Sequence, residues 1–288
     1  MFKNFLAKMG ATLALFFAIL IVLEALTLMV LVGRDIPRAR RIAVLDVEGT
    51  ILDSEPIISK LHKYRDDSSV AAIVLRINSP GGMAAAAQEI YQEVRRVRQE
   101  GKRVFASIES LGASGGYYIA CGAESIFANP STITGSIGVI LPTANYKELM
   151  DKLGLKFGGI KSGDYKDIGS PFKDMTEEER NILQAFVDDV HDQFVEAVAE
   201  GRGMEKSEVK KLANGQVFTG RQALAIGLVD RLGNLNDAIS WAAKRVGIEG
   251  KPKIIREKKA FPFSELFSEA TSKLFSPKTE GAMYYWGN

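Results

Sequence analysis

Apolar residues along the middle of the chain alternate between strand-like and helix-like patterns. Residues 70–78, V-A-A-I-V-L-R-I-N, are β-branched and almost continuously apolar, which is typical of a strand buried on both faces. The segment after them has charged residues between apolar ones at intervals of three and four, which predicts an amphipathic helix. Its apolar positions are Met83, Ala87, Ile90, Val94 and Val97.

The same patterns recur as far as residue 259. They predict strands at residues 41–52, 103–109, 125–128, 132–139, 155–161 and 253–259, and helices at residues 56–64, 145–153, 176–201 and 234–246. A short helix ending at Gly227 and a further strand lie between the last two helices. Thr176, followed three residues later by Glu179, forms a capping box for the longest helix. Alternating strands and helices predict an α/β layered fold with a largely parallel sheet.

Residues 10–33 are apolar almost throughout, with Glu24 as the exception. As a helix they would extend about 35 Å, enough to cross the hydrocarbon core of a bilayer. The run is longer than the apolar region of a secretory signal and is followed by G-R-D-I-P, so we expect an uncleaved transmembrane helix. Arginines follow the span at positions 34, 38, 40 and 41, and this charge bias alone would place the body of the chain in the cytoplasm.

These patterns divide the chain into five parts. Residues 1–9 are a short N-terminal segment, residues 10–33 the anchor, and residues 34–40 a linker. Residues 41–250 form the main domain, and residues 251–288 a strand and an amphipathic tail. With 37 Lys and Arg against 35 Asp and Glu, no electrostatic argument favours nucleic-acid binding. A single cysteine excludes an intramolecular disulfide and a cysteine-based metal site.

Two glycine turns follow successive predicted strands. Gly81 and Gly82 come after the strand at 70–78, and Ser114 lies between glycines after the strand at 103–109. Parallel strands end at one edge of a sheet, where ligands bind. We therefore expect both turns to lie at one site.

The segment G-A-S-G-G around Ser114 matches G-x-S-x-G, the nucleophile elbow of α/β-hydrolases. That chemistry needs a histidine downstream, and His191 is the only one; we expect it on the polar, solvated side of the long helix. His62 lies upstream, in the wrong order. A lysine can instead serve as the base if desolvation lowers its pKa from about 10.4 by about three units. Spacing does not choose among the candidates Lys147, Lys152, Lys156, Lys161, Lys166 and Lys173.

Four ordered motifs make the chain similar to the bacterial signal peptide peptidase A family. They are I-N-S-P-G-G at 77–82, G-A-S-G-G-Y-Y at 112–118, T-G-S-I-G-V at 134–139 and K-S-G-D-Y-K-D at 161–167. A later segment, F-T-G-R-Q-A-L-A-I-G-L-V-D, resembles the closing motif of that family. The resemblance spans about residues 41–245 and corresponds to the short, half-length form. It implies the fold of the ClpP and crotonase superfamily.

The resemblance also implies roles for five residues. Ser114 would be the nucleophile, Lys166 the general base, and Ser136 the hydroxyl beside that lysine. The N–H groups of Gly82 and Gly115 would form the oxyanion hole. Asp164 and Asp167 flank Lys166. An extended segment would direct Asp167 away from it.

The implied activity is that of a serine endopeptidase with a Ser/Lys dyad that degrades remnant signal peptides without cofactor or metal. The family forms homo-oligomeric rings, and in the short form the serine and lysine of one site come from neighbouring protomers. Against the arginine bias, the family places the catalytic domain outside the cytoplasm, on a single-pass anchor in the bacterial inner membrane. Two alternatives stay open: an α/β-hydrolase-type esterase using Ser114 and His191, and a non-catalytic membrane scaffold of this fold.

Overall fold

The computed structural model describes residues 16–24 and 40–257 of the chain. Residues 16–24 are helical, and no helix within these two stretches is both long and apolar enough to cross a bilayer. Most of the span expected at residues 10–33, and the tail beyond residue 257, lie outside the described residues. The chain divides into one unit that ends at Ile255 and a second that starts at Arg256, and the following account concerns the first.

An eight-stranded sheet forms the centre of the domain, in the order β6-β5-β3-β2-β1-β8, with β4 beside β3 and β7 beside β4. β1 pairs with β2, and β2 with β3, in parallel. β3 also pairs in parallel with β4 and with β5, whereas β6 runs antiparallel to β5. The largely parallel sheet expected from the sequence is therefore confirmed. The strands are β1 (Arg41–Glu48), β2 (Val70–Ser79), β3 (Arg103–Ala113), β4 (Ile126–Ala128), β5 (Ile133–Gly135), β6 (Val217–Thr219), β7 (Arg231–Leu232) and β8 (Lys253–Arg256).

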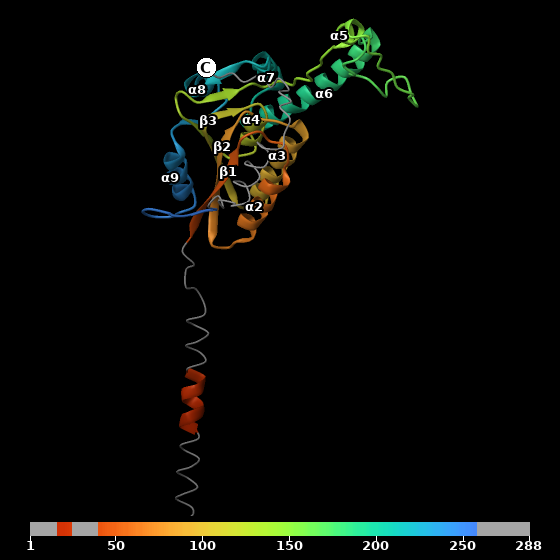
Figure 1. Ribbon diagram of the computed structural model, residues 1–288. Helices are drawn as coiled ribbons and strands as arrows, with labels where there is room; N and C mark the ends of the chain where they lie inside the picture. The colour runs from red at the N-terminus through yellow and green to blue at the C-terminus, as the bar shows by residue number, and fades with distance from the viewer. Residues whose placement is uncertain (1–15, 25–39, 258–288) are drawn as a thin grey trace, which may run out of the picture. The chain divides into compact units, whose positions relative to one another are not determined.

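Helices cover both faces of this sheet (Figure 1). A large core joins one face to α2, α3, α4 and the second half of α6, and a smaller core joins the other face to α9. The central strand β2 is buried on both sides, which explains its almost continuous run of apolar residues. The helices are α2 (Glu55–Asp66), α3 (Ala84–Gln99), α4 (Gly115–Ala120), α5 (Lys147–Lys152), α6 (Glu177–Arg202), α7 (Lys206–Leu212), α8 (Gly220–Ala225) and α9 (Leu235–Arg245).

Residues 140–186, which we call the arm, contain α5 and the first part of α6 and extend beyond the layered body (Figure 1). The capping box of Thr176 and Glu179 is present at the start of α6. The strand expected at residues 155–161 is wrong, because these residues form no strand and are exposed. Apolar residues there, such as Phe157 at 63% exposed, have no neighbouring strand to pair with. The short helix α7 was not expected.

Candidate active site

Two serines follow the ends of two neighbouring parallel strands. Strands β3 and β5 pair Ala113 with Gly135, so Ser114 and Ser136 are the next residue of each. The N–H of Ser114 donates to the carbonyl of Gly135 at 2.9 Å. Among the described residues these two serines are the only non-glycine residues with positive φ, 51° and 50°. Such a conformation costs about 1–3 kcal/mol and concentrates at functional sites.

The turn at Ser114 leads directly into the buried helix α4. The carbonyl of Ser114 accepts the N–H of Tyr118 at 2.9 Å, while its hydroxyl makes no capping hydrogen bond. Tyr117 is fully buried and donates its hydroxyl to the carbonyl of Leu228 at 2.7 Å. The helix therefore fixes the backbone of Ser114 and leaves its Oγ free to react.

The glycine turn after β2 lies directly against this serine. A Cβ placed on Gly81 would lie 2.6 Å from the backbone nitrogen of Gly115 and 2.8 Å from the Cβ of Ser114. Buried Ser79 holds the turn, since its hydroxyl donates to the carbonyl of Gly49 at 2.6 Å and accepts the N–H of Gly81 at 3.1 Å. The expectation that both glycine turns share one edge of the sheet is confirmed.

Two backbone N–H groups near Ser114 remain available. Gly115 is the first residue of α4, so its N–H has no acceptor in the preceding turn of the helix. Within the described part of the chain, the N–H of Gly82 also has no acceptor, whereas that of Gly81 is used by Ser79. A Cβ on Gly115 would lie 3.4 Å from the nitrogen of Gly82, so the two donors are close together. Their role as an oxyanion hole stays a prediction.

A cavity of about 480 Å³, the Ser114 cavity, opens beside the two serines. Helix α6 forms its far wall through Gln184, Val187, Asp188 and His191. Residues 138–140 and 213–215 complete the lining. None of the described residues that line it is a lysine, so this copy of the chain supplies no lysine base to Ser114.

The expectation that His191 lies on a solvated helix face is wrong. His191 is half-buried in the wall of the Ser114 cavity, and its Nε2 is buried with no hydrogen-bond partner in the described structure. The next turns of α6 carry Phe194, Val195 and Val198, which belong to the large core. His191 therefore stands where the helix passes from the exposed arm into the body of the domain.

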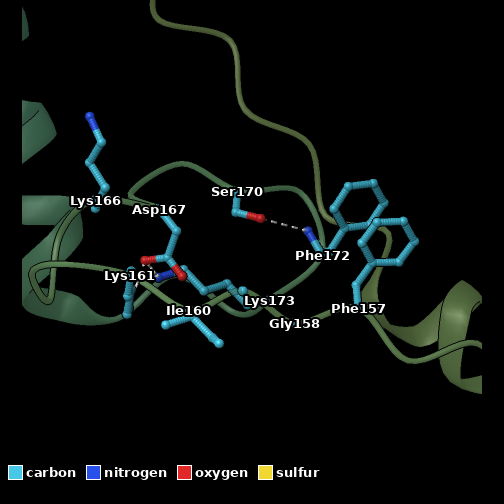
Figure 2. Close-up of a pocket in the computed structure, with 10 residues that line it drawn as sticks. Phe157, Gly158, Ile160, Lys161, Lys166, Asp167, Ser170, Phe172 and Lys173 are labelled. Carbon is cyan, nitrogen blue, oxygen red and sulfur yellow. Dashed lines mark hydrogen bonds and ion pairs between the residues drawn. The ribbon is translucent and has the colours of Figure 1, made fainter.

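Lys166 lies elsewhere, in the wall of a second cavity of about 440 Å³, the Lys166 cavity (Figure 2). This cavity belongs to the arm and includes the stacked rings of Phe157 and Phe172, whose centroids are 4.1 Å apart. The N–H of Lys166 donates to the carbonyl of Gly163 at 3.2 Å, so Lys166 lies in a turn and not in an extended segment. The structure thus does not bring Ser114 and Lys166 together within one chain.

Asp167 is held away from Lys166 by two other lysines. Its Oδ1 accepts from the Nζ of Lys161 at 2.7 Å and of Lys173 at 2.8 Å, and Lys173 also pairs with Glu179 on α6. These hydrogen bonds lower the pKa of Asp167 to about 2. In Figure 2 the side chain of Lys166 points away from this cluster. The carboxylate of Asp167 is therefore neutralised by Lys161 and Lys173, rather than directed away from Lys166 by the alternation of side chains along a strand.

Three of the candidate lysines form ion pairs. Lys147 pairs with Asp174, while Lys161 and Lys173 share Asp167. Lys152, Lys156 and Lys166 have no carboxylate partner within the described residues, so ion pairing does not choose among these three. An unpaired amine can be desolvated without first breaking an ion pair, so Lys166 suits the role of a neutral base better than the three paired lysines.

Replacing Asp167 with Asn should loosen the loop that carries Lys166. Lys161 and Lys173 would lose their shared carboxylate, so we expect faster amide hydrogen exchange across residues 161–173 and about a tenfold loss of the peptide cleavage expected from the resemblance. Because the pKa of Asp167 is lowered in the folded chain, its contribution is complete above about pH 4 and is lost as pH falls towards 2. The exchange difference between wild type and Asp167→Asn should therefore be constant from pH 5 to 8 and shrink below pH 4.

Asp174→Asn is the matched control for this prediction. It removes another exposed carboxylate of the arm, the partner of Lys147, without touching the Asp167 cluster. Equal losses of cleavage in both variants would show that Asp167 has no particular role in positioning Lys166.

Comparison with known proteins identifies relatives of this chain. Residues 96–249 match peptidase family S49. A Synechocystis protein that carries a protease name is 45% identical over 211 residues, which are 73% of this chain and 76% of that protein. An Enterococcus faecium protein carries the name of signal peptide peptidase SppA and is 38% identical over 218 residues, 71% of this chain and 63% of that protein.

A plant relative matches as well. The chloroplastic serine protease SPPA of Arabidopsis thaliana is 32% identical over 211 residues, 73% of this chain but 31% of the plant protein. The matched stretch thus covers about three quarters of one relative, and less than two thirds of the other two.

Proposed function

The chain belongs to peptidase family S49, the family expected from its motifs, and on this premise we propose that it is a membrane-anchored serine endopeptidase. Its substrates would be remnant signal peptides and other apolar peptides. The observation that carries the proposal is the geometry at Ser114, whose strained turn presents a free hydroxyl beside the N–H groups of Gly82 and Gly115.

In the proposed reaction, the Oγ of Ser114 attacks the peptide carbonyl while the neutral amine of Lys166 accepts its proton. The N–H groups of Gly82 and Gly115 stabilise the oxyanion, and each such donor is worth about 3 kcal/mol. The ammonium of Lys166 then protonates the leaving amine, so the C–N bond breaks and an acyl-enzyme remains. Water then attacks the ester while the neutral amine of Lys166 accepts its proton, and Lys166 returns that proton to the Oγ of Ser114 as the C–O bond breaks, which releases the carboxylic acid and restores the enzyme. Ser136, beside Ser114, would orient the amine.

We further propose that the site is shared between copies in a homo-oligomeric ring. Ser114 and Lys166 line different cavities of one chain, so one copy alone lacks the dyad. The arm exposes many large apolar side chains, a feature of surfaces that bind other proteins. They include Ile140, Leu149, Leu153, Leu155, Phe157 and Ile160. Docking of the arm on a neighbour would bury them, and would desolvate Lys166 beside the neighbour's Ser114.

The apolar run at residues 10–33 supports a membrane anchor. The resemblance to signal peptide peptidase A, against the arginine bias, supports the bacterial inner membrane and a catalytic domain outside the cytoplasm. Apolar peptides suit the Ser114 cavity, since Val139, Ile140 and Val187 contribute to its wall. An anchored enzyme would meet such peptides where they accumulate.

A second candidate function is a Ser/His hydrolase contained in one chain. The observation that favours it is the presence of Ser114, Asp188 and His191 around one cavity, with the Nε2 of His191 unpaired. The order Ser, Asp, His along the chain is also that of α/β-hydrolases. Against it, the unpaired Nε2 is itself buried, so it is not exposed to the cavity as a base must be.

The activities of Lys166→Ala and His191→Ala should distinguish the serine–lysine endopeptidase from the Ser/His hydrolase. With an apolar fluorogenic peptide and the full-length chain in detergent, we expect Lys166→Ala to lower kcat/KM by at least about a thousandfold because the base is lost. His191→Ala should retain activity within about tenfold. The reverse result, with p-nitrophenyl ester hydrolysis surviving Lys166→Ala and lost in His191→Ala, would establish the Ser/His hydrolase instead.

A further inference from the structure

A basic hollow lies near the edge of the sheet opposite Ser114, where the strands begin. It has a volume of about 470 Å³, and its charged lining consists of four cations and one carboxylate: Arg95, Arg98, Lys102, Arg103 and Glu124. Arg103 opens β3, whereas Ser114 follows the last residue of that strand. The hollow is therefore separate from the catalytic edge, and the proposed reaction does not use it.

Two of the four cations have no carboxylate partner within the described residues. Arg98 donates through Nη1 to the carbonyls of Gly122 and Ala123, at 2.8 and 3.2 Å. Lys102 donates to the carbonyls of Asp67 and Val70, at 3.0 and 2.7 Å. A guanidinium has five N–H donors and an ammonium three, so both groups keep donors free for a ligand.

The remaining two cations have carboxylate partners, one of which is shared. Arg95 pairs with Glu200, whereas Glu124 pairs with both Arg103 at 2.7 Å and Arg245 at 3.1 Å. Burial lowers the pKa of both Arg98 and Lys102, and the neighbouring charge of Arg95 lowers that of Arg98 further. The hollow thus holds excess positive charge in a half-desolvated setting, which a bound anion would stabilise.

The chain enters the domain beside this hollow. Arg41 begins β1, its N–H donates to the carbonyl of Ser69 at 2.8 Å, and β1 lies two strand positions from β3. Two strand spacings are about 10 Å. The predicted anchor ends at residue 33, and the seven residues 34–40 can span at most about 25 Å. An anchored chain therefore keeps this edge of the sheet close to the bilayer surface.

We propose that the basic hollow binds the phosphate of an anionic phospholipid headgroup. Charge complementarity favours an anion, and the short connection to the anchor favours a lipid over a free phosphate. Binding would direct the start of the strands towards the bilayer and the Ser114 edge away from it. The proposal rests on the membrane anchoring put forward under the proposed function.

Short-chain lipids test this directly on the full-length chain in a neutral detergent. Native mass spectrometry would count bound dihexanoyl-phosphatidylglycerol and dihexanoyl-phosphatidylcholine in separate titrations. We expect the wild type to bind the anionic phosphatidylglycerol at least about tenfold more strongly than the zwitterionic phosphatidylcholine. Because each basic residue contributes about fivefold near an anionic surface, Arg95→Gln with Arg103→Gln should weaken that binding by about 25-fold. This pair leaves the carbonyl contacts of Arg98 and Lys102 in place.

The matched control is Lys206→Gln with Lys210→Gln. These lysines of α7 are also paired with carboxylates, Glu196 and Asp192, so the change in charge is the same. Equal retention of the two lipids, or equal loss in both double variants, would overturn the proposal. Displacement of the anionic lipid by inorganic phosphate at constant ionic strength would overturn it too, because the hollow would then be a free-phosphate site.

Two other measurements test the proposed function independently of lipid binding. Alkaline extraction of membranes reports whether the chain is anchored, and peptide cleavage by the wild type reports on Ser114 chemistry. Neither measurement depends on the lipid titration.

Discussion

Mixing two inactive variants, Ser114→Ala and Lys166→Ala, should restore peptide cleavage. Each variant alone should lose at least about a thousandfold in kcat/KM, because each lacks one half of the dyad. In a ring with head-to-tail contacts, every Ser114 cavity meets the arm of one neighbour. When equal amounts assemble at random, about one contact in four joins an intact Ser114 to an intact Lys166. The mixture should therefore recover up to about 25% of wild-type activity.

The control for this experiment is a mixture of either single variant with the double variant Ser114→Ala/Lys166→Ala. Such a mixture contains no complementary pair and should stay inactive. Co-expression of two differently tagged chains, followed by native mass spectrometry, would verify that mixed oligomers have formed. No recovery in verified mixed oligomers would place both residues of each site in one chain and contradict the shared site.

Features set by local interactions could be predicted from the sequence. The core pattern of β2, the apolar spacing of α3 and the capping box of α6 are all present in the structure. The strand expected at residues 155–161 failed because a strand needs a hydrogen-bonding neighbour, and the arm offers none there. Gly158 and Gly159 interrupt that segment, and the apolar residues around them stay exposed.

Parts of the candidate site were predictable for a topological reason. Parallel strands end at one edge, so the turns at Gly81 and Ser114 had to meet. The partial burial of His191 was not predictable. Helix α6 is exposed along the arm and buried in the body of the domain, and its amino-acid pattern does not show at which residue exposure ends and burial begins. The separation of Lys166 from Ser114 could not be derived from their spacing along the chain, which sets no distance in space, and was expected only from the resemblance to the family.

Replacing Gly81 with Ala should abolish most of the catalysis without unfolding the domain. The new Cβ would lie 2.6 Å from the nitrogen of Gly115 and 2.8 Å from the Cβ of Ser114, and both belong to the fixed turn into α4. These atoms would have to shift, which would move the nucleophile and one oxyanion donor together. Since loss of a single donor costs about a hundredfold to a thousandfold in kcat, we expect a fall of at least that size with KM little changed.

Gly247→Ala separates this local effect from backbone strain. Gly247 also has positive φ, 70° against 99° for Gly81, but a Cβ there would meet no atom within 4 Å. It follows α9, on the sheet face away from the large core. Both variants should lose about 1 kcal/mol of folding stability from the unfavourable φ, and Gly81→Ala should lose more because its Cβ overlaps the nitrogen of Gly115. Only Gly81→Ala should lose kcat. If it kept wild-type kcat, the closeness of the two glycine turns would be a packing feature, and the oxyanion hole would have to be sought elsewhere.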